Sequence, residues 1–197
     1  MVLKISKYGD PVLRQKGKRI EKITPEIEKL IQDMFDSMHE AHGVGLAAQQ
    51  IGRDLQLTVI DVTGADKERP STLELDGKPT DVKAFMPIVL INPEIRPYGN
   101  AAKGPEGCLS FPEMYADITR PGFVEVNATG PKGEKISFKA GGLLARAVQH
   151  EVDHLNGILF IDRMSATDKR ELKPELDELQ AVTKEELKQR KDPPLSK

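Results

Sequence analysis

The segment GGLLARAVQHEVDHLNG, residues 141–157, carries the clearest helix signal in the chain. After Gly142 come leucine, alanine and arginine, which favour helices, and Asn156–Gly157 supplies the residue types that commonly end one. We therefore predict a helix of about a dozen residues between these limits, an ordinary length for a globular domain.

HEVDH, residues 150–154 within this predicted helix, has the spacing of a metal site. Helix positions four apart differ by only about 40° around the axis, so His150 and His154 face the same way and can bind one ion. Glu151 lies at the flank of that face, where a carboxylate can act as a general base on water. The alternative is that these side chains lie on a helix without binding a metal. With four histidines in the chain, this spacing favours a hydrolytic metal site, which normally takes a third protein ligand.

The residues alone leave that third ligand open. One candidate is an acid of the C-terminal tail, as in metallopeptidases that supply a glutamate from a later helix, and three acids are suitably placed: Glu171, Glu175 and Glu178. The other candidate is Cys108, the single cysteine, because a thiolate binds divalent metals strongly. Against it, a lone cysteine is often a small buried hydrophobic residue.

Composition limits the class of protein. The chain has 197 residues, 38% of them hydrophobic and 30% charged, so it fits one domain with a hydrophobic core and an appendage. A formal net charge of -2 provides no general surface for DNA. The N-terminus lacks the apolar core of a signal peptide, and the apolar run at 85–91 is too short to span a membrane. A single cysteine excludes an internal disulfide and suits a reducing compartment. From these features together we expect a cytoplasmic protein without DNA or membrane partners.

The remaining segments predict the architecture. An amphipathic helix is expected after Thr24, which would be its N-cap, and Gly43 would end it. Its apolar residues recur at helical spacing on one face: Ile27, Leu30, Ile31, Met34, Phe35 and Met38. Strands are expected at 55–63, 87–95, 123–129 and 135–140. The polar residues 64–84 are expected to form an exposed, mobile loop with at most a short hairpin.

A charged helix is expected from Thr167 onward, with Leu172, Leu176 and Leu179 on one face and a frayed end. Strands in a block with helices at either end indicate an α+β fold. We expect mostly antiparallel sheets packed around a central helix bearing HEVDH, with an N-terminal amphipathic helix and a C-terminal helix.

Three further stretches accompany HEVDH: EGCLS at 106–110, GVGLAAQQ at 43–50 and GDPVLR at 9–14. Together these motifs resemble those of the peptide deformylase family, and the resemblance covers residues 5–165. It implies that Cys108, His150 and His154 bind one divalent metal ion, with water in the fourth position. Ferrous iron is the expected ion, and zinc, nickel or cobalt suit the same ligands. The resemblance also implies a catalytic domain at 1–165 and a helical extension with a frayed tail at 166–197.

The chemistry implied by the resemblance is hydrolysis of the N-formyl group of the formylmethionine that begins nascent proteins, with release of formate. Glu151 would take a proton from the water and pass it to the departing amine. The Gln50 side-chain amide and the Leu109 backbone N–H would donate to the oxygen that gains negative charge. The terminal segment would help the enzyme to associate transiently with ribosomes.

A methionine side chain requires an apolar pocket beside the metal. Helix spacing offers Leu143 and Ala147 for it, and the motifs offer Val44 and Leu109. Each is equally suited to the core, but the resemblance favours a place in the pocket lining. Gly43 and Gly45 would let the backbone come close to a substrate that lies along this segment as an added strand.

Arg146 lies one turn before His150, so its charge must either reach solvent at the pocket mouth or pair with an acid. We expect the first, with Arg146 attracting the substrate backbone or its carboxylate. The reason is that the acids nearest in sequence, Glu151 and Asp153, do not lie at helical pairing distance.

This chain departs from some relatives at two positions. Where they often have an acid before the first motif and an arginine after EGCLS, it has His42 and Tyr115. The binding of substrate residues beyond methionine is therefore open. His42 and His39 are assigned no metal, because a pair near a helix end is more often solvated.

Two other classes of protein share part of this pattern. A metallopeptidase of the HExxH type would use a tail glutamate as third ligand and leave Cys108 out of the site. A structural metal site would be closed by a fourth protein ligand, whereas catalysis requires an open position.

Overall fold

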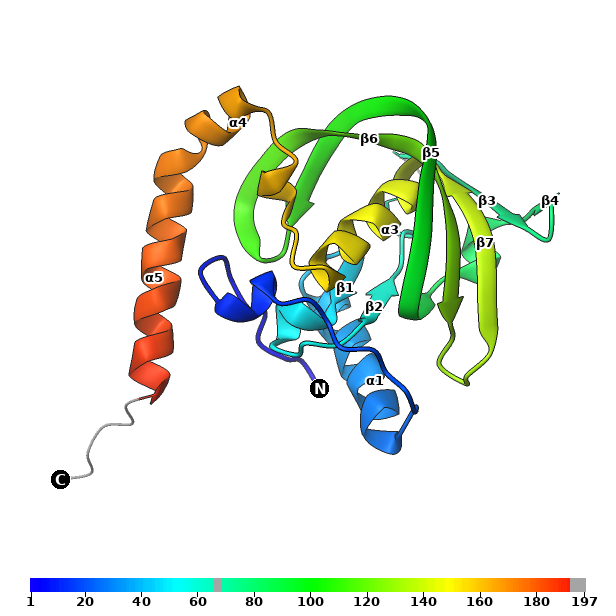
Figure 1. The fold of residues 1–197 in the computed structure, drawn as a ribbon, viewed down its shortest axis with the longest axis horizontal. Coiled ribbons are helices and arrows are strands. Elements are labelled where there is room, and N and C mark those ends of the chain that lie inside the picture. Colours follow the sequence, from blue (N-terminus) through cyan, green and yellow to red (C-terminus); the bar gives the residue numbers. More distant parts are fainter. Residues whose placement is uncertain (66–68, 192–197) are drawn as a thin grey trace.

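Strands β5 (Ile88–Cys108) and β6 (Phe111–Thr129) form a long antiparallel hairpin that bends around helix α3 (Gly142–Leu155), as Figure 1 shows. The structure is a computed structural model, and it describes residues 1–65 and 69–191. Five shorter strands complete a seven-stranded sheet in the order β1-β2-β5-β6-β7-β3-β4: β1 (Gly45–Ala47), β2 (Leu57–Ile60), β3 (Ser71–Leu75), β4 (Lys78–Pro79) and β7 (Lys135–Gly141). All neighbouring strands are antiparallel, which confirms the mixed fold of helices and antiparallel strands, although the strands join one sheet rather than several.

The central hairpin is much longer than predicted. Strands were expected at 87–95 and 123–129, but pairing continues through Lys103 opposite Thr119 to Glu106 opposite Ala116. Residues 96–107 contain prolines, glycines and polar side chains without alternation, so the sequence gives little strand signal there. Hydrogen bonds to a partner strand distant in sequence produce the extension. The strand expected at 55–63 is shorter than predicted, because only Leu57–Ile60 form β2.

Helix α3 is buried on all sides. It contacts β1, β2, β3, β5, β6 and β7, and every residue from Leu143 to Leu155 except Arg146 is buried. On one side its apolar residues share a core with β6 and β7. A helix that carries two histidines and two acids therefore lies in the interior, where each polar group requires a partner.

Helix α1 (Pro25–Glu40) packs its apolar face against β1, β2 and β5. Thr24 occupies the N-cap position, but its side chain makes no capping hydrogen bond. The helix ends at Glu40 rather than at Gly43, because His42 adopts a left-handed φ of 55° and the Gly43 N–H bonds to the Met38 carbonyl at 2.9 Å.

Residues 69–84, expected to form an exposed loop with at most a short hairpin, contain that hairpin and the start of a helix. Strands β3 and β4 form a hairpin through Asp76 and Gly77, both with positive φ, and helix α2 (Val82–Phe85) follows. Strand β3 pairs with β7, and Leu73 and Val82 are buried in the main core. The part of the expected mobile loop at 66–68 lies outside the described residues.

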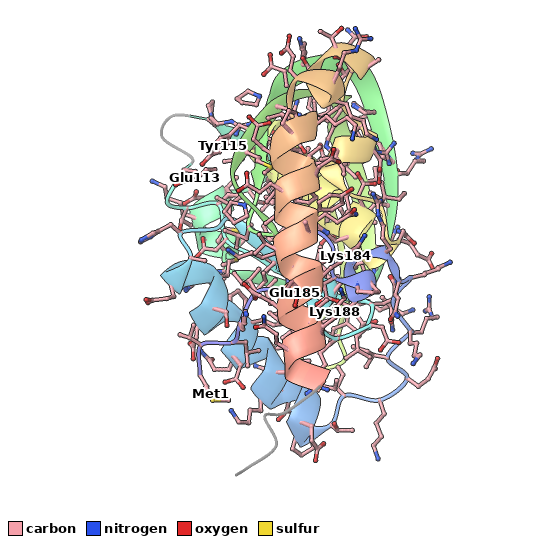
Figure 2. All side chains as sticks on the ribbon, turned by 90° about the vertical axis from the view of Figure 1, so that its left-hand side faces the viewer. Met1, Glu113, Tyr115, Lys184, Glu185 and Lys188 are labelled. Atoms are coloured by element: carbon pink, nitrogen blue, oxygen red, sulfur yellow. The ribbon has the colours of Figure 1, made fainter. Side chains whose placement is uncertain are left out.

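The C-terminal segment forms two helices, α4 (Ala166–Glu171) and α5 (Lys173–Lys191), where one was expected. Leu176 is buried in a cluster that includes Phe111 and Phe160, and Leu172 and Leu179 pack against it partly exposed. Figure 2 shows α5 lying along one face of the molecule. Residues 192–197, expected to fray, lie outside the described ranges. Within those ranges, no helix has both the length and the apolar character needed to cross a membrane.

Leu176→Ala should lower the free energy of unfolding by about 2–5 kcal/mol, because it removes buried apolar atoms and leaves a cavity beside Phe111 and Phe160. Urea denaturation followed by circular dichroism measures this change. Val182, on the same helix and 51% exposed, provides the control: Val182→Ala should change stability by less than about 0.5 kcal/mol. Equal effects of the two substitutions would contradict the packing of α5 on the core.

Candidate metal centre

Cys108 ends β5, and His150 and His154 lie on successive turns of α3. A register shift between Gly107 and Cys108 interrupts the pairing of β5 with β6, and such irregularities redirect side chains. One ligand atom from each of the three residues lies within 4.8 Å of the others, and Cys108 Sγ is 3.2 Å from His154 Nε2. In the part of the chain that the structure describes, this is the group of side chains that could hold an ion.

The alternative ligands lie elsewhere. Glu171, Glu175 and Glu178 are exposed on α4 and α5, and among residues 1–65 and 69–191 they belong to no candidate ligand group. His39 belongs to none either, and its Nε2 lies 3.3 Å from an oxygen of Asp61. The side chain brought to the two histidines is therefore that of Cys108.

The donor set fits a divalent transition metal. One thiolate with two imidazoles suits iron, zinc, cobalt and nickel. Glu106 Oε2 lies 3.0 Å from His150 Nδ1, so a proton on Nδ1 would leave the lone pair of Nε2 for an ion. Burial lowers the pKa of His154 well below its usual value, and the charge of His150 acts in the same direction. That ring is therefore neutral, as a metal ligand must be.

The surroundings of His150 favour positive charge. Burial lowers the pKa of this ring, but hydrogen bonds to Cys108 and Glu106 and the negative charges of Cys108 and Glu151 outweigh burial and raise the pKa well above its usual value. A divalent ion at the same place would meet the same attraction.

Glu151 lies on α3 beside these ligands and is 4% exposed. Burial raises its pKa to about 7, while the charge of His150 opposes this rise. Its Oε2 atom has no hydrogen-bond partner among the described residues. A buried carboxylate with a free acceptor atom and a pKa near neutrality is suited to accept a proton and return it.

Two glycines make room for side chains of the site. A Cβ on Gly45 would lie 2.4 Å from Glu151 Oε1, and a Cβ on Gly43 would lie 2.7 Å from Leu109 Cδ1. A side chain at position 45 would therefore displace Glu151, whereas one at position 43 would require the end of the Leu109 side chain to shift. The close approach to substrate expected of them from the sequence stays a prediction.

Gln50, in η2 (Ala48–Ile51), has a fixed orientation. Its Oε1 accepts a hydrogen bond from the Ala47 backbone N–H at 2.8 Å, so the NH₂ group must point the other way. There Nε2 lies 3.5 Å from Cys108 Sγ and 3.3 Å from Ser110 Oγ. A hydrogen-bond donor is thus held beside a candidate metal ligand, on the wall of a cavity.

That cavity has a volume of about 520 Å³. Its lining includes Cys108, His150 and Glu151. The other residues expected at the substrate site also line it: Val44, Gly45, Leu109, Leu143, Arg146 and Ala147. Tyr115 and His42, the two departures from the family pattern, are at the same cavity, and Tyr115 is 70% exposed. In Figure 2 its side chain lies near Glu113 on the face that α5 crosses.

The expectation that the Arg146 charge reaches solvent is wrong. Its Nη1 donates to Glu106 Oε1 at 2.8 Å and to the Ile118 carbonyl at 2.9 Å, and its Nη2 donates to the Ala102 carbonyl at 2.8 Å. The acid partner comes from β5, so a search along the helix itself could not find it. Arg146 ties the β5–β6 hairpin to α3 and leaves no bare charge in the cavity.

Sequence reasoning gave no role to Glu106 and Arg120, which are both buried beside the ligands. Arg120 Nε lies 2.6 Å from Glu106 Oε1, and Arg120 Nη1 lies 2.8 Å from Asp153 Oδ2. Burial raises the pKa of Glu106, but hydrogen bonds from His150 and Arg120 outweigh it and hold the pKa well below its usual range. The sequence could have indicated a role for Glu106, because this residue begins the EGCLS motif, whereas Arg120 lies in no motif.

Comparisons with known proteins show which family this chain resembles over most of its length. A family model described as polypeptide deformylase matches residues 2–170. A peptide deformylase of Methylacidiphilum infernorum (isolate V4) is 44% identical over 179 residues, which cover 91% of this chain and 93% of the relative. A crystal structure of a plant peptide deformylase is similar with a TM-score of 0.80 at 38% identity, over 93% of this chain and 92% of that one. A peptide deformylase from Synechococcus elongatus in complex with actinonin gives a TM-score of 0.73 at 40% identity, over 87% and 85%.

Cys108→Ala should remove most bound metal and leave a folded protein, because two imidazoles alone hold a divalent ion much more weakly than the full set. Elemental analysis after gel filtration measures the metal, and circular dichroism checks the fold. His39→Ala, which removes a histidine outside the ligand group, should keep the wild-type metal content. Stoichiometric metal in Cys108→Ala would exclude the cysteine as a ligand.

Proposed function

The chain belongs to the peptide deformylase family, and from that premise we propose that Cys108, His150 and His154 hold its catalytic metal ion. It is an enzyme that removes the N-formyl group from the N-terminal formylmethionine of newly made proteins. The observation that carries the proposal is the convergence of three ligand atoms within 4.8 Å at the wall of the cavity.

Ferrous iron is the ion we assign to this site, with zinc, nickel or cobalt able to replace it. The donor set of a thiolate and two imidazoles accepts all four ions, and the resemblance to the family favours iron among them. When bound, such an ion would act as a Lewis acid and lower the pKa of a water toward about 7.

Glu151 performs the proton transfers in this proposal. Its carboxylate takes a proton from the water that attacks the formyl carbon, and returns it to the nitrogen as the carbon–nitrogen bond breaks. Formate and a free amine are the products. The support is the free Oε2 atom of Glu151 and its pKa of about 7, which suits both steps at neutral pH.

Gln50 and Leu109 stabilise the negative charge on the formyl oxygen. The Ala47 N–H fixes the Gln50 amide so that its NH₂ group donates toward the cavity. Leu109 follows Cys108 directly and lines the same cavity, so its backbone N–H is assigned as the second donor. A donor held in place before the reaction stabilises developing charge without a cost of reorientation.

The methionine side chain is assigned to the apolar part of the cavity, beside Val44, Leu143 and Ala147. Leu143 and Ala147 are 6% and 5% exposed, so a thioether chain placed there would be largely shielded from water. Neutralisation of Arg146 by Glu106 supports this assignment, because an unpaired guanidinium would oppose an apolar ligand.

We assign residues 1–165 to the catalytic domain and 166–197 to an extension that associates transiently with ribosomes in the cytoplasm. Figure 2 shows Lys184, Glu185 and Lys188 on the outer side of α5. The side chains of Lys188 and Glu185 are 74% and 60% exposed, which leaves this side of the helix accessible to a large partner.

Glu151→Gln tests the assigned chemistry, because an amide of the same shape cannot accept the proton. Formate release from a formyl-methionyl peptide, under anaerobic conditions with iron, should fall by about 10²–10⁴-fold while bound metal is unchanged. The acetyl-methionyl peptide is the control substrate and should release no acid with wild type. Loss of metal from Glu151→Gln would make Glu151 a ligand, and full turnover would remove its role as base.

Gly45→Ala should impair the same step, because the new Cβ would collide with Glu151 Oε1 and displace the carboxylate. We expect kcat to fall by about 10²-fold with metal content unchanged, as for a misplacement of about 1 Å. Gly64→Ala is the matched control, because a Cβ there meets nothing within 4 Å. Wild-type kcat in Gly45→Ala would show that the position of Glu151 tolerates such a shift.

A further inference from the structure

Glu106 is a buried carboxylate, with 4% of its side chain exposed, at which three other side chains meet. Its Oε1 accepts from Arg120 Nε at 2.6 Å and from Arg146 Nη1 at 2.8 Å. Its Oε2 accepts from Arg120 Nη2 at 3.0 Å and lies 3.0 Å from His150 Nδ1. Four bonds to two oxygens use the full acceptor capacity of a carboxylate.

The guanidinium groups around Glu106 prevent it from rotating. Arg120 binds both oxygens in a fork geometry, and its third nitrogen donates to Asp153 Oδ2 at 2.8 Å. Arg163 in turn donates to Asp153, from Nη2 to Oδ1 at 2.7 Å and from Nε to Oδ2 at 3.1 Å. The carboxylate that faces His150 is therefore held by a series of charged pairs that continues through Asp153 to Arg163.

We propose that Glu106 is a positioning residue for His150, which fixes the tautomer and the orientation of its ring toward the metal. This inference rests on the proposed metal centre. With a proton on Nδ1 directed at Glu106, the lone pair of Nε2 points toward Cys108 and His154. A carboxylate partner also makes the ring a stronger electron donor to an ion.

The two histidines differ in this respect. His154 Nδ1 has no hydrogen-bond partner among the described residues, whereas His150 Nδ1 has Glu106. The ring of His154 is confined by packing, since the residue is 1% exposed, while that of His150 is held by a directed bond to a charge. Loss of Glu106 should therefore act on the metal through His150.

Glu106→Gln tests the proposal, because an amide has a single acceptor oxygen and can keep only part of the four bonds. The dissociation constant for Zn²⁺, measured by competition with a chromophoric chelator, should rise by about 10–100-fold. Arg163→Met is the matched control, since it removes two bonds at the other end of the network and leaves the acceptor of His150 in place. Its dissociation constant should equal that of wild type.

An unchanged zinc dissociation constant in Glu106→Gln would overturn the positioning role. So would an equal rise in Arg163→Met, because it would show that any damage to the network weakens binding. These results are distinct from failure of the metal centre itself, which would appear as no zinc binding by wild type or as equal binding by Cys108→Ala.

A second measurement uses the wild-type protein and does not depend on the folding of a variant. Imidazole nitrogen NMR of the ¹⁵N-histidine-labelled, zinc-loaded enzyme reports which nitrogen of each ring carries a proton. His150 should have its proton on Nδ1 and the metal on Nε2, which is the arrangement that the contact between Nδ1 and Glu106 requires. A proton on Nε2 of His150 would overturn the proposal.

Discussion

Burial of α3 on every side is the constraint on which the rest of the structure depends. A helix that carries HEVDH in a dry interior must find a partner for each polar group, because an unpaired buried group costs about 1–3 kcal/mol and more if charged. The sheet supplies these partners: His150 is bound by Glu106 of β5, and Asp153 by Arg120 of β6. Among the described residues, Glu151 Oε2 and His154 Nδ1 of this helix have no partner, and Glu151 Oε2 is the atom to which we assign the proton transfer.

The end of β5 therefore has two tasks that are performed by neighbouring residues. In the proposed centre Cys108 would provide a ligand, and Glu106, two residues earlier, would hold the ring of a second ligand. Both depend on the long β5–β6 hairpin, which Arg146 ties to α3 through two backbone carbonyls and Glu106. The same contact neutralises a cation that would otherwise face an apolar cavity. Helix α3 thus links the proposed metal binding to the fold of the hairpin and to the apolar lining of the cavity.

Local sequence signals located the parts of the fold that are determined locally. Glycines and Asn156 at the ends of 142–155 marked the limits that α3 has, and apolar segments bounded by Pro and Gly located β7 and the ends of β5 and β6 that pair with each other. Spacing alone could not identify Cys108 as a ligand, because this residue lies 42 positions before His150 and only the folded hairpin brings it to α3. The family motifs indicated it. Arg146 was misjudged for the same reason, since its acid partner Glu106 is 40 residues away.

X-ray absorption at the zinc edge of the zinc-loaded enzyme tests the central claim most directly, because it identifies the atoms bound to the ion. The account predicts one sulfur at about 2.3 Å, contributed by Cys108, with nitrogen and oxygen atoms in the rest of the shell. A first shell of nitrogen and oxygen without sulfur would contradict it, because Cys108 would then lie outside the metal site.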